Sequence, residues 1–211
     1  MKNKLGILCM ILGALLILGA LALFFYNRHE EEMAAEQVDE LMPLLMEVIE
    51  NEQQSSTEPS IPDQPMGTPV EYLDPSALIM KEVKINGYPY IGYLSIPTLE
   101  LNLPVMSDWT YNRLKIAPCR YHGSVRGENL VIMAHNFARH FGKISELTEG
   151  DQVIFTDMDG AITIYQVVAQ DVLDPYAVEE MTEGEFDLTL FTCTYGGKSR
   201  MTIYCDIVKS G

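Results

Sequence analysis

The sequence Thr189-Leu-Phe-Thr-Cys-Thr-Tyr-Gly-Gly-Lys198 decides the fold expected for this chain. It begins inside an apolar run, residues 186–192, and ends in a glycine turn that precedes a second apolar run, residues 201–208. Two such runs joined by a short glycine-rich turn predict a β-hairpin. Cys193 and Arg200 should therefore lie on adjacent strands, close together near one end of the hairpin.

Cys193 has the residue type and the neighbour expected of a nucleophile. A thiol beside a fixed guanidinium charge is biased toward the thiolate, the form that attacks carbonyl carbons. A third apolar run, residues 129–134, ends in His135, which could serve as the proton-transfer group. A lone cysteine is more often a small buried side chain. A thiol, an imidazole and a guanidinium at strand ends together predict acyl transfer.

The N-terminal segment, residues 5–26, contains no charged side chain. At about 1.5 Å per residue, a helix of this length covers the roughly 30 Å hydrocarbon core of a bilayer. Two lysines within residues 1–4 precede it, which predicts a cytoplasmic tip and an exported domain. A cleaved signal peptide is the alternative, because Ala20-Leu-Ala22 resembles a cleavage site. The apolar run continues to Tyr26, which favours an uncleaved anchor.

The formal net charge of −16 is concentrated between the anchor and the predicted domain. Residues 27–80 carry one basic and thirteen acidic side chains, so we expect an acidic stalk and linker there. We place the catalytic domain at residues 81–211. The composition excludes a nucleic-acid-binding protein, which needs a concentrated basic face.

Helical spacing of apolar residues in the stalk predicts a helix over residues 30–41. Pro43 is expected to break it or to begin a second short helix, residues 44–50. The apolar stripe of the stalk has three open partners: another copy of the chain, the membrane surface, or nothing. Residues 51–69 are rich in Gln, Ser, Thr and Pro and predict a disordered spacer.

Three cysteines, Cys119, Cys193 and Cys205, lie beyond the anchor. An odd number leaves at least one thiol unpaired. A Cys119–Cys205 bridge and three free thiols both remain open. We expect Cys205 in the core and Cys119 in a loop. The spacing includes no Cys-x-x-Cys pair, which argues against structural zinc, and we expect no metal or other cofactor.

The remainder of the domain predicts an all-β fold with short helices. Strands are expected at residues 90–96, 99–105, 129–134, 152–156 and 161–171, besides the hairpin. Short helices are expected near residues 111–115, 141–147 and 177–181. Seven or eight strands separated by turn signals predict a closed or nearly closed β-barrel.

Four sequence blocks, in this order behind an N-terminal anchor, resemble the sortase family of membrane-anchored cysteine transpeptidases from Gram-positive surfaces. The blocks are Ile91-Gly-Tyr-Leu-Ser-Ile-Pro97 running into Leu101-Asn-Leu-Pro-Val105; Gly127-Glu-Asn-Leu-Val-Ile-Met-Ala-His135; Phe141-Gly-Lys-Ile-Ser-Glu-Leu147 with Gly150-Asp151; and Thr189-Leu-Phe-Thr-Cys193 with Arg200. The resemblance covers about residues 88–208 and implies a closed eight-stranded sortase-like β-barrel.

The resemblance also implies a function and a role for each site residue. Cys193 would attack the Thr–Gly carbonyl of a Leu-Pro-x-Thr-Gly-like sorting signal on a secreted protein and form a thioester. An amine of a peptidoglycan precursor, or a pilin lysine, would release the product. His135 would act as general acid and base, Arg200 would hold substrate and oxyanion, and Thr192 would support the oxyanion.

The subclass implied by the resemblance is class D-like or unclassified. The connection over residues 172–187 is short, whereas class B members carry a long helical insertion. Pilin-type class C members have an Asp-Pro-aromatic lid, and here Ser76 follows Asp74-Pro75. Many pilin-type members also have a second, C-terminal apolar span, and the given sequence shows none before Gly211.

Two other functions remain open. An L,D-transpeptidase-like cell-wall cross-linker also uses Cys, His and Arg, but it places them within one segment, and here His135 and Cys193 are 58 residues apart. A non-catalytic surface scaffold could keep the barrel without turnover. Among the other histidines, His29 abuts the membrane, and His122 and His140 are expected in solvated loops. Four aromatic residues are expected either to line a peptide groove or to pack: Trp109, Tyr111, Tyr121 and Tyr195.

Overall fold

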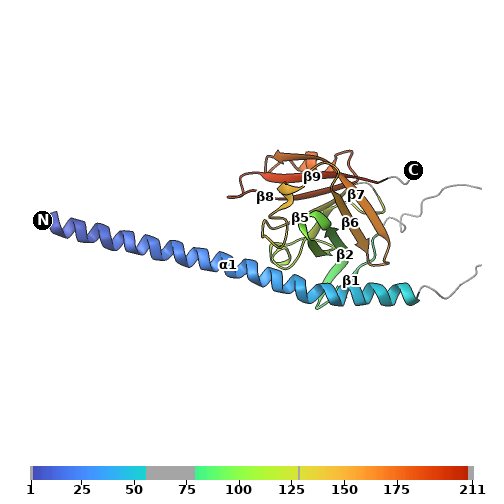
Figure 1. The fold of residues 1–211 in the computed structure, drawn as a ribbon, viewed down its shortest axis with the longest axis horizontal. Coiled ribbons are helices and arrows are strands. Elements are labelled where there is room, and N and C mark those ends of the chain that lie inside the picture. Colours follow the sequence, from blue (N-terminus) through green and yellow to red (C-terminus); the bar gives the residue numbers. More distant parts are fainter. Residues whose placement is uncertain (1, 56–78, 128, 209–211) are drawn as a thin grey trace, which may run out of the picture.

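The computed structural model describes residues 2–55, 79–127 and 129–208. One long helix, α1 (Lys2–Ser55), runs past a β-domain (Figure 1). Its N-terminal half extends away from the domain, and its C-terminal half lies along one side of it. α1 is long and apolar enough, near its N-terminus, to cross a membrane. The spacer predicted over residues 51–69 is helical as far as Ser55, and the rest lies outside the described residues.

The described β-strands form one sheet. They are β1 (Val83–Ile85), β2 (Tyr88–Ile96), β3 (Leu101–Met106), β4 (Cys119–His122), β5 (Leu130–Ala134), β6 (Gln152–Asp157), β7 (Ile162–Leu173), β8 (Leu188–Cys193) and β9 (Arg200–Ile207). The short helices are α2 (Tyr111–Leu114), α3 (Val178–Thr182) and the 3₁₀ turns η2 (Pro97–Leu99) and η3 (Ile144–Glu146). Each predicted strand and short helix is present, with ends shifted by a few residues.

The sheet closes on itself. Its order is β1-β2-β3-β4-β5-β8-β9-β7-β6, and β6 pairs again with β2, so eight strands form a ring and β1 is an added edge strand. At this closing pair Gly92 has φ 147°, and a Cβ atom there would collide with the Thr156 carbonyl oxygen. Glycine is therefore required where the two strands meet. The predicted closed eight-stranded β-barrel is confirmed.

The barrel interior is filled by alternating apolar side chains from both halves of the domain, among them Ile91, Leu94, Leu103, Leu130, Phe155, Leu190 and Ile203. Cys205 belongs to this core, as its alternation predicts. The loop predicted for Cys119 is wrong, because Cys119 begins β4, pairs with Met133 on β5 and is buried. All four cysteines are free, so no Cys119–Cys205 bridge forms.

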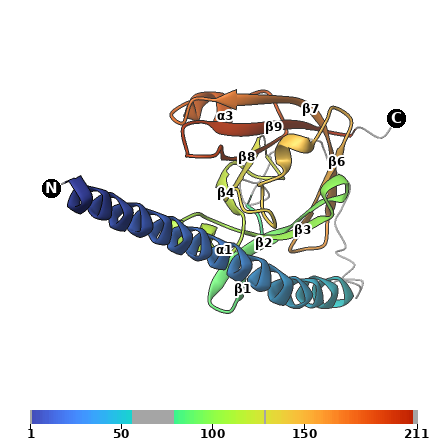
Figure 2. The same ribbon diagram turned by 60° about the vertical axis from the view of Figure 1, so that its left-hand side comes forward.

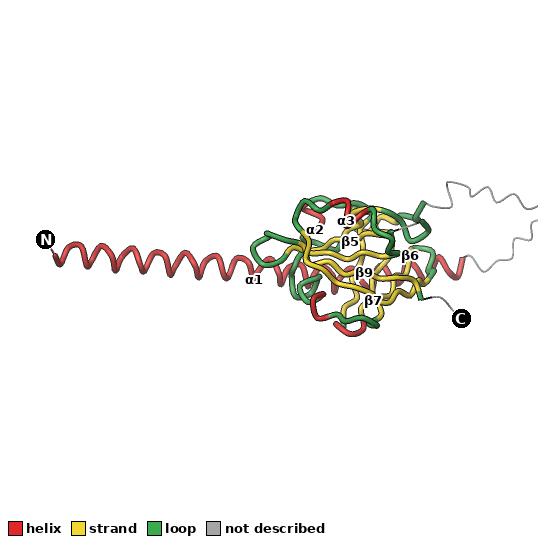
Figure 3. The backbone as a smooth tube through the Cα atoms, turned by 90° about the horizontal axis from the view of Figure 1, so that it is seen from above, coloured by secondary structure: helices red, strands yellow, loops and turns green. Residues whose placement is uncertain are grey.

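The apolar stripe of the stalk packs on the chain's own barrel. The buried side chains follow one face of α1 at helical spacing: Ala34, Val38, Leu41, Leu45 and Ile49. Leu45 belongs to a cluster with Ile85 on β1 and with Tyr90 and Met106 on β2 and β3. Figures 2 and 3 show the C-terminal half of α1 lying against the barrel in two further views. Burial of this stripe makes the second half of α1 part of the domain.

The predicted break at Pro43 is wrong, because α1 continues through it to Ser55. Proline removes one helical hydrogen bond and crowds the preceding turn, at a cost of about 3 kcal/mol. Leu41 and Leu45 flank Pro43 and are both buried against the barrel. The packing of these two leucines offsets the local cost of proline. A stalk helix that packs on nothing would lack this stabilisation.

Candidate active site

The β8–β9 hairpin positions the first two candidate residues. Cys193 ends β8 and Arg200 begins β9, and the two are direct cross-strand partners. Side chains of directly opposed residues in an antiparallel pair project from the same face of the sheet. Both residues are half-buried, so each is partly open to solvent. The local hairpin alone therefore brings thiol and guanidinium together.

His135 reaches the same place through a parallel pairing. Strand β5 lies beside β8, with Ala134 opposite Thr192. The Thr192 hydroxyl donates a hydrogen bond to the Ala134 carbonyl oxygen at 2.8 Å, which ties the two strand ends. His135 and Cys193 are the next residues of the two strands, and parallel strands end at the same edge of a sheet. This register places the histidine beside the cysteine.

A cavity of about 200 Å³ has His135, Cys193 and Arg200 in its wall. Its other walls are mainly apolar and aromatic, from Trp109, Tyr111, Tyr121, Met133, Val178, Met181 and Phe191. Trp109 meets Tyr111 edge-on, with ring centroids 5.8 Å apart, and Tyr121 meets Phe191 in the same way at 5.3 Å. Three of the four aromatic residues left open by the sequence thus line this cavity. The fourth, Tyr195, lines another.

Burial and charge both act on the His135 ring. Burial lowers its pKa, the Lys115 ammonium lowers it further, and the Glu30 carboxylate opposes both effects. The imidazole stacks on Phe137 with centroids 4.8 Å apart and planes 28° from parallel. The stack restricts the ring, and the lowered pKa favours its neutral form near pH 7.

The expectation that His140 is solvated is wrong, because this side chain is fully buried. The Phe141 N–H donates to the His135 carbonyl oxygen, and the Gly142 N–H donates to that of Phe137. These bonds turn the loop inward, so that His140 packs behind Phe137 with centroids 5.6 Å apart. Burial lowers the pKa of His140 to about 4. His122 is exposed, as expected, but it ends strand β4 and does not lie in a loop.

Gly142 allows the loop that follows His135 to fold back closely on itself. A Cβ atom at this position would lie 2.7 Å from the carbonyl oxygens of both Asn136 and Phe137. Real Cβ contacts do not approach backbone atoms so closely, and the loop would have to open to accept a side chain. The glycine in the third sequence block therefore serves the backbone that carries His135.

Helix α1 supplies residues around this site that sequence reasoning missed. The Ala138 N–H donates to Glu31 Oε1 at 2.6 Å, and the Lys115 ammonium donates to Glu30 Oε1 at 2.7 Å. Arg139 forms an ion pair with Asp39. These partners are about a hundred residues apart in the chain, and neither spacing nor composition links them. The apolar stripe of α1 indicates that the helix packs on another surface, but it does not indicate that the helix passes close to His135.

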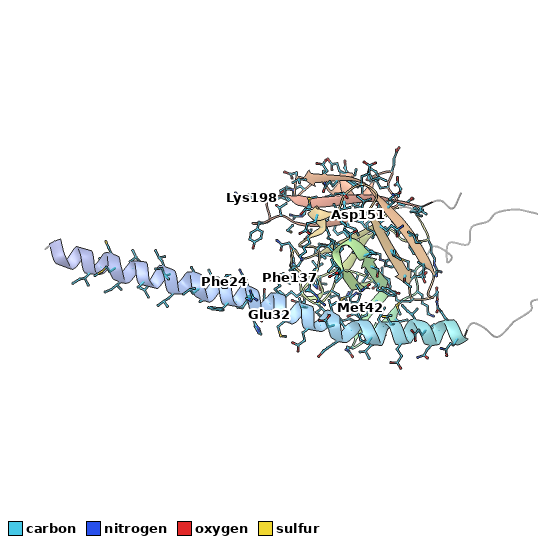
Figure 4. The ribbon with its side chains drawn as sticks, in the orientation of Figure 1. Phe24, Glu32, Met42, Phe137, Asp151 and Lys198 are labelled. Carbon is cyan, nitrogen blue, oxygen red and sulfur yellow. The ribbon has the colours of Figure 1, made fainter. Side chains whose placement is uncertain are left out.

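Two further cavities adjoin the site. One of about 240 Å³ is bordered by Cys193, Ser145 and Met201, so the cysteine faces two openings. Another, of about 420 Å³, lies between residues 24–31 of α1 and the loops that follow His135 and Cys193. Phe24 and Phe137 are in its wall, and Figure 4 labels both. In the part of the chain that the structure describes, no group of three His, Cys, Asp or Glu side chains is arranged to hold a metal ion.

The chain is similar to known proteins over most of its length. A family model described as the sortase domain matches residues 94–208. Sortase A of Streptococcus agalactiae is 24% identical over 95% of this chain and 85% of its own length. Sortases are cysteine transpeptidases that act in cell-wall sorting.

Solved sortase structures share the fold. Sortase C from Streptococcus pneumoniae superposes with a TM-score of 0.55, 22% identity and coverage of 83% of this chain and 97% of that one. Sortase A from Corynebacterium diphtheriae superposes with a TM-score of 0.55 and 20% identity, and the match covers 87% of this chain and 94% of that one. Sortase C1 from Streptococcus suis superposes with a TM-score of 0.52 and 25% identity, and the match covers 58% of this chain and 74% of that one. The domain match, the closed barrel and the shared overall fold agree: the chain belongs to the sortase family.

Proposed function

We propose that this sortase cleaves a Leu-Pro-x-Thr-Gly-like sorting signal at the C-terminus of secreted proteins and joins them to an amine of the cell wall. The observation that carries the proposal is the wall of the 200 Å³ cavity, in which Cys193, His135 and Arg200 meet beside an aromatic groove. The aromatic side chains suit the leucine and proline of such a signal, because apolar pockets bind apolar side chains.

In the first half-reaction the Cys193 thiolate attacks the Thr–Gly carbonyl carbon, and a C–S bond forms. Collapse of the tetrahedral intermediate breaks the C–N bond. His135, which takes up the proton of the Cys193 thiol when the thiolate forms, donates that proton to the leaving amine, which would otherwise be a poor leaving group. The product is a thioester between Cys193 and the threonine carbonyl.

In the second half-reaction an amine attacks the thioester carbonyl. Neutral His135 accepts the proton that the amine loses, the C–S bond breaks, and the Cys193 thiolate is restored. The charges and atoms balance over the two steps, since the proton given to the first amine is recovered from the second. The stack on Phe137 supports this role, because it holds the His135 imidazole in place for both proton transfers.

Arg200 is proposed to stabilise the oxyanion of both tetrahedral intermediates and to hold the substrate. One guanidinium nitrogen donates to the Gly197 and Ser199 carbonyl oxygens, at 3.2 and 3.1 Å, which fixes the side chain at the turn. A planar fork with further N–H groups suits an oxyanion and a carbonyl together. Thr192 is proposed to support the oxyanion site, and its bond to Ala134 adds the positioning of β5 against β8.

We further propose the membrane topology. Residues 5–26 anchor the enzyme with residues 1–4 in the cytoplasm and residues 81–211 outside, joined by the acidic stalk and linker 27–80. The lysines before the apolar segment and the acidic residues after it support this orientation. The proposed partners are sorting-signal proteins and a peptidoglycan precursor or other amine.

The test uses the full chain in lipid vesicles with a fluorogenic Leu-Pro-x-Thr-Gly peptide and an added glycine-peptide amine. Wild-type protein should give the cleaved peptide, the amine adduct and a thioester mass on the Cys193 peptide. Cys193→Ala should give none of these, and Cys205→Ala, a buried thiol of the adjacent strand, should retain them. Turnover of a tetrapeptide stem instead would support the cross-linking function. Absence of turnover on sorting-signal and stem peptides of varied sequence would support the scaffold.

A further inference from the structure

We propose that the β8–β9 turn, residues 195–198, inserts into the headgroup layer of the bilayer that α1 crosses. The lipid bilayer is then a binding partner of the catalytic domain itself, in addition to the anchor. This inference rests on the membrane anchoring of α1 and is independent of the transpeptidase reaction.

The position of the bilayer surface along α1 follows from the sequence. The apolar segment ends at Tyr26, which marks the edge of the hydrocarbon core. The headgroup layer adds about 5–7 Å on each side of that core. At about 1.5 Å per helical residue, this thickness corresponds to roughly four or five residues of α1. The outer headgroup layer therefore surrounds residues 27–31.

The β8–β9 turn lies level with that layer. The cavity of about 420 Å³ between α1 and the barrel is lined by Phe24 and Arg28 on the helix and by Tyr195 and Gly196 on the turn. Phe24 belongs to the apolar segment itself. Figure 4 shows Lys198 at the end of the barrel that faces the N-terminal half of α1. The turn thus reaches the edge of the hydrocarbon core.

The chemistry of the turn fits a lipid surface. Tyr195 is 99% exposed, Lys198 is exposed, and residues 194–199 contain no acidic side chain although the chain as a whole is strongly acidic. Tyrosine favours the headgroup level, where its ring is in an apolar layer and its hydroxyl in a wet one. A lysine there gains attraction to lipid phosphate. The bilayer covers an aromatic ring that the described protein leaves in water.

Insertion fixes where the active site opens. Cys193 lies two residues before Tyr195, so a turn held in the headgroup layer keeps the thiol at the membrane surface. The contacts of Glu31 with the Ala138 N–H and of Asp39 with Arg139 hold the loop that follows His135 on α1. The domain is thereby attached to the membrane-proximal helix on one side and to the lipid on the other.

The test measures depth with single-tryptophan variants of the full chain in phosphatidylcholine–phosphatidylglycerol vesicles. Trp109→Phe removes the native indole, and one tryptophan is then introduced at Tyr195, Tyr26 or Ile162. Tyr26→Trp reports the anchor. Ile162→Trp is the matched control, because Ile162 is exposed and lies far from the proposed lipid surface. It follows Gly160, whose carbonyl oxygen accepts a hydrogen bond from Gln53 of α1. Gln53 is about 40 Å along α1 from Tyr26.

Lipids spin-labelled at the headgroup should quench Tyr195→Trp and Tyr26→Trp several-fold more than Ile162→Trp, and aqueous iodide should show the reverse order. Equal lipid quenching of Tyr195→Trp and Ile162→Trp would overturn the proposal. So would an unquenched Tyr26→Trp, because α1 then does not anchor the chain. Tyr195→Trp could also be shielded from iodide in a way that depends on protein concentration and persists without lipid. That result would overturn the proposal, because the turn would then contact a second copy of the chain and not the bilayer.

Discussion

Cys193 and Arg200 are direct cross-strand partners at the turn of the β8–β9 hairpin, and both border the cavity that His135 enters from β5. The hairpin fixes the first two groups relative to each other through local geometry. His135 depends instead on the register between β5 and β8, which the Thr192–Ala134 hydrogen bond helps to hold. The position of Cys193 relative to Arg200 therefore depends on local structure, and the position of His135 relative to both depends on a long-range strand pairing.

The three thiols of the domain should differ sharply in reactivity. Burial raises the pKa of Cys119 to about 12 and raises that of Cys205 well above its usual range. Cys193 is half-buried in the wall of the cavity and should be alkylated first. The fourth cysteine, Cys9, lies in α1 and is exposed, so it is first changed to serine (Cys9→Ser). Peptide mass spectrometry after brief labelling of this variant at several pH values then measures the difference. Comparable labelling of Cys119 or Cys205 in folded protein would contradict it.

Arg200→Lys should lower kcat/KM by about 10²–10³-fold while leaving the fold intact. An ammonium keeps the charge but loses the planar pair of donors. Arg126→Lys is the matched control, because Arg126 pairs with Asp157 and Asp159 away from the cavity. Steady-state kinetics and thermal unfolding separate the two effects. Similar losses in both variants would reject a specific role for Arg200.

Glu31→Ala should lower kcat/KM several-fold, because it removes the acceptor of the Ala138 N–H in the loop that follows His135. The loss in unfolding free energy should be about 0.5–1.5 kcal/mol. Glu31→Gln keeps an acceptor oxygen and should retain most activity. Glu32→Ala, which loses only an exposed pair with Arg28 on the same helix, should behave as wild type. Equal effects at both positions would show that α1 does not position the loop.

Lys115 and Glu30 should shift the pH profile of the enzyme in opposite directions. The Lys115 ammonium lowers the pKa of His135, and the Glu30 carboxylate raises it. Lys115→Met should therefore move the His135 limb of the rate–pH profile to higher pH, and Glu30→Gln should move it to lower pH. Profiles of kcat/KM at constant ionic strength measure this. Shifts of the same sign would contradict the placement of this pair beside the imidazole.

His140 should make the protein less stable in acid. Its pKa is about 4 in the folded state and about 6.5 when unfolded, so the unfolded chain binds a proton first. The stability that depends on the neutral ring is fully present above pH 6.5 and is lost as the pH falls through 6.5 toward 4, by about 3 kcal/mol in total. His140→Phe should remove this part of the pH dependence in urea unfolding. The same change at exposed His122 is the control, and identical curves for wild type and His140→Phe would refute the prediction.

Sequence patterns located most of the strands because each depends on neighbours in the chain. Strict alternation over residues 101–105 defines β3, and the Gly-Gly turn defines the hairpin of Cys193 and Arg200. The errors lie where distant segments meet. The sequence misplaces His140 in solvent, because a loop histidine with no partner nearby in the sequence has no local signal of burial. The sequence does not indicate a strand at Cys119, because β4 is only four residues long.

The sequence by itself determined the apolar N-terminal segment, the β-rich domain and the pairing of a cysteine with an arginine across one turn, since hydrophobic period and turn chemistry are local properties. Tertiary structure decided that the stalk is a wall of the domain and that Pro43 lies within one continuous helix. It also decided that Glu30 and Glu31 lie close to His135. These outcomes depend on burial between segments that are distant in the sequence. The free energy of that burial outweighs local preference, and the apolar stripe of α1 by itself does not identify the partner on which it packs.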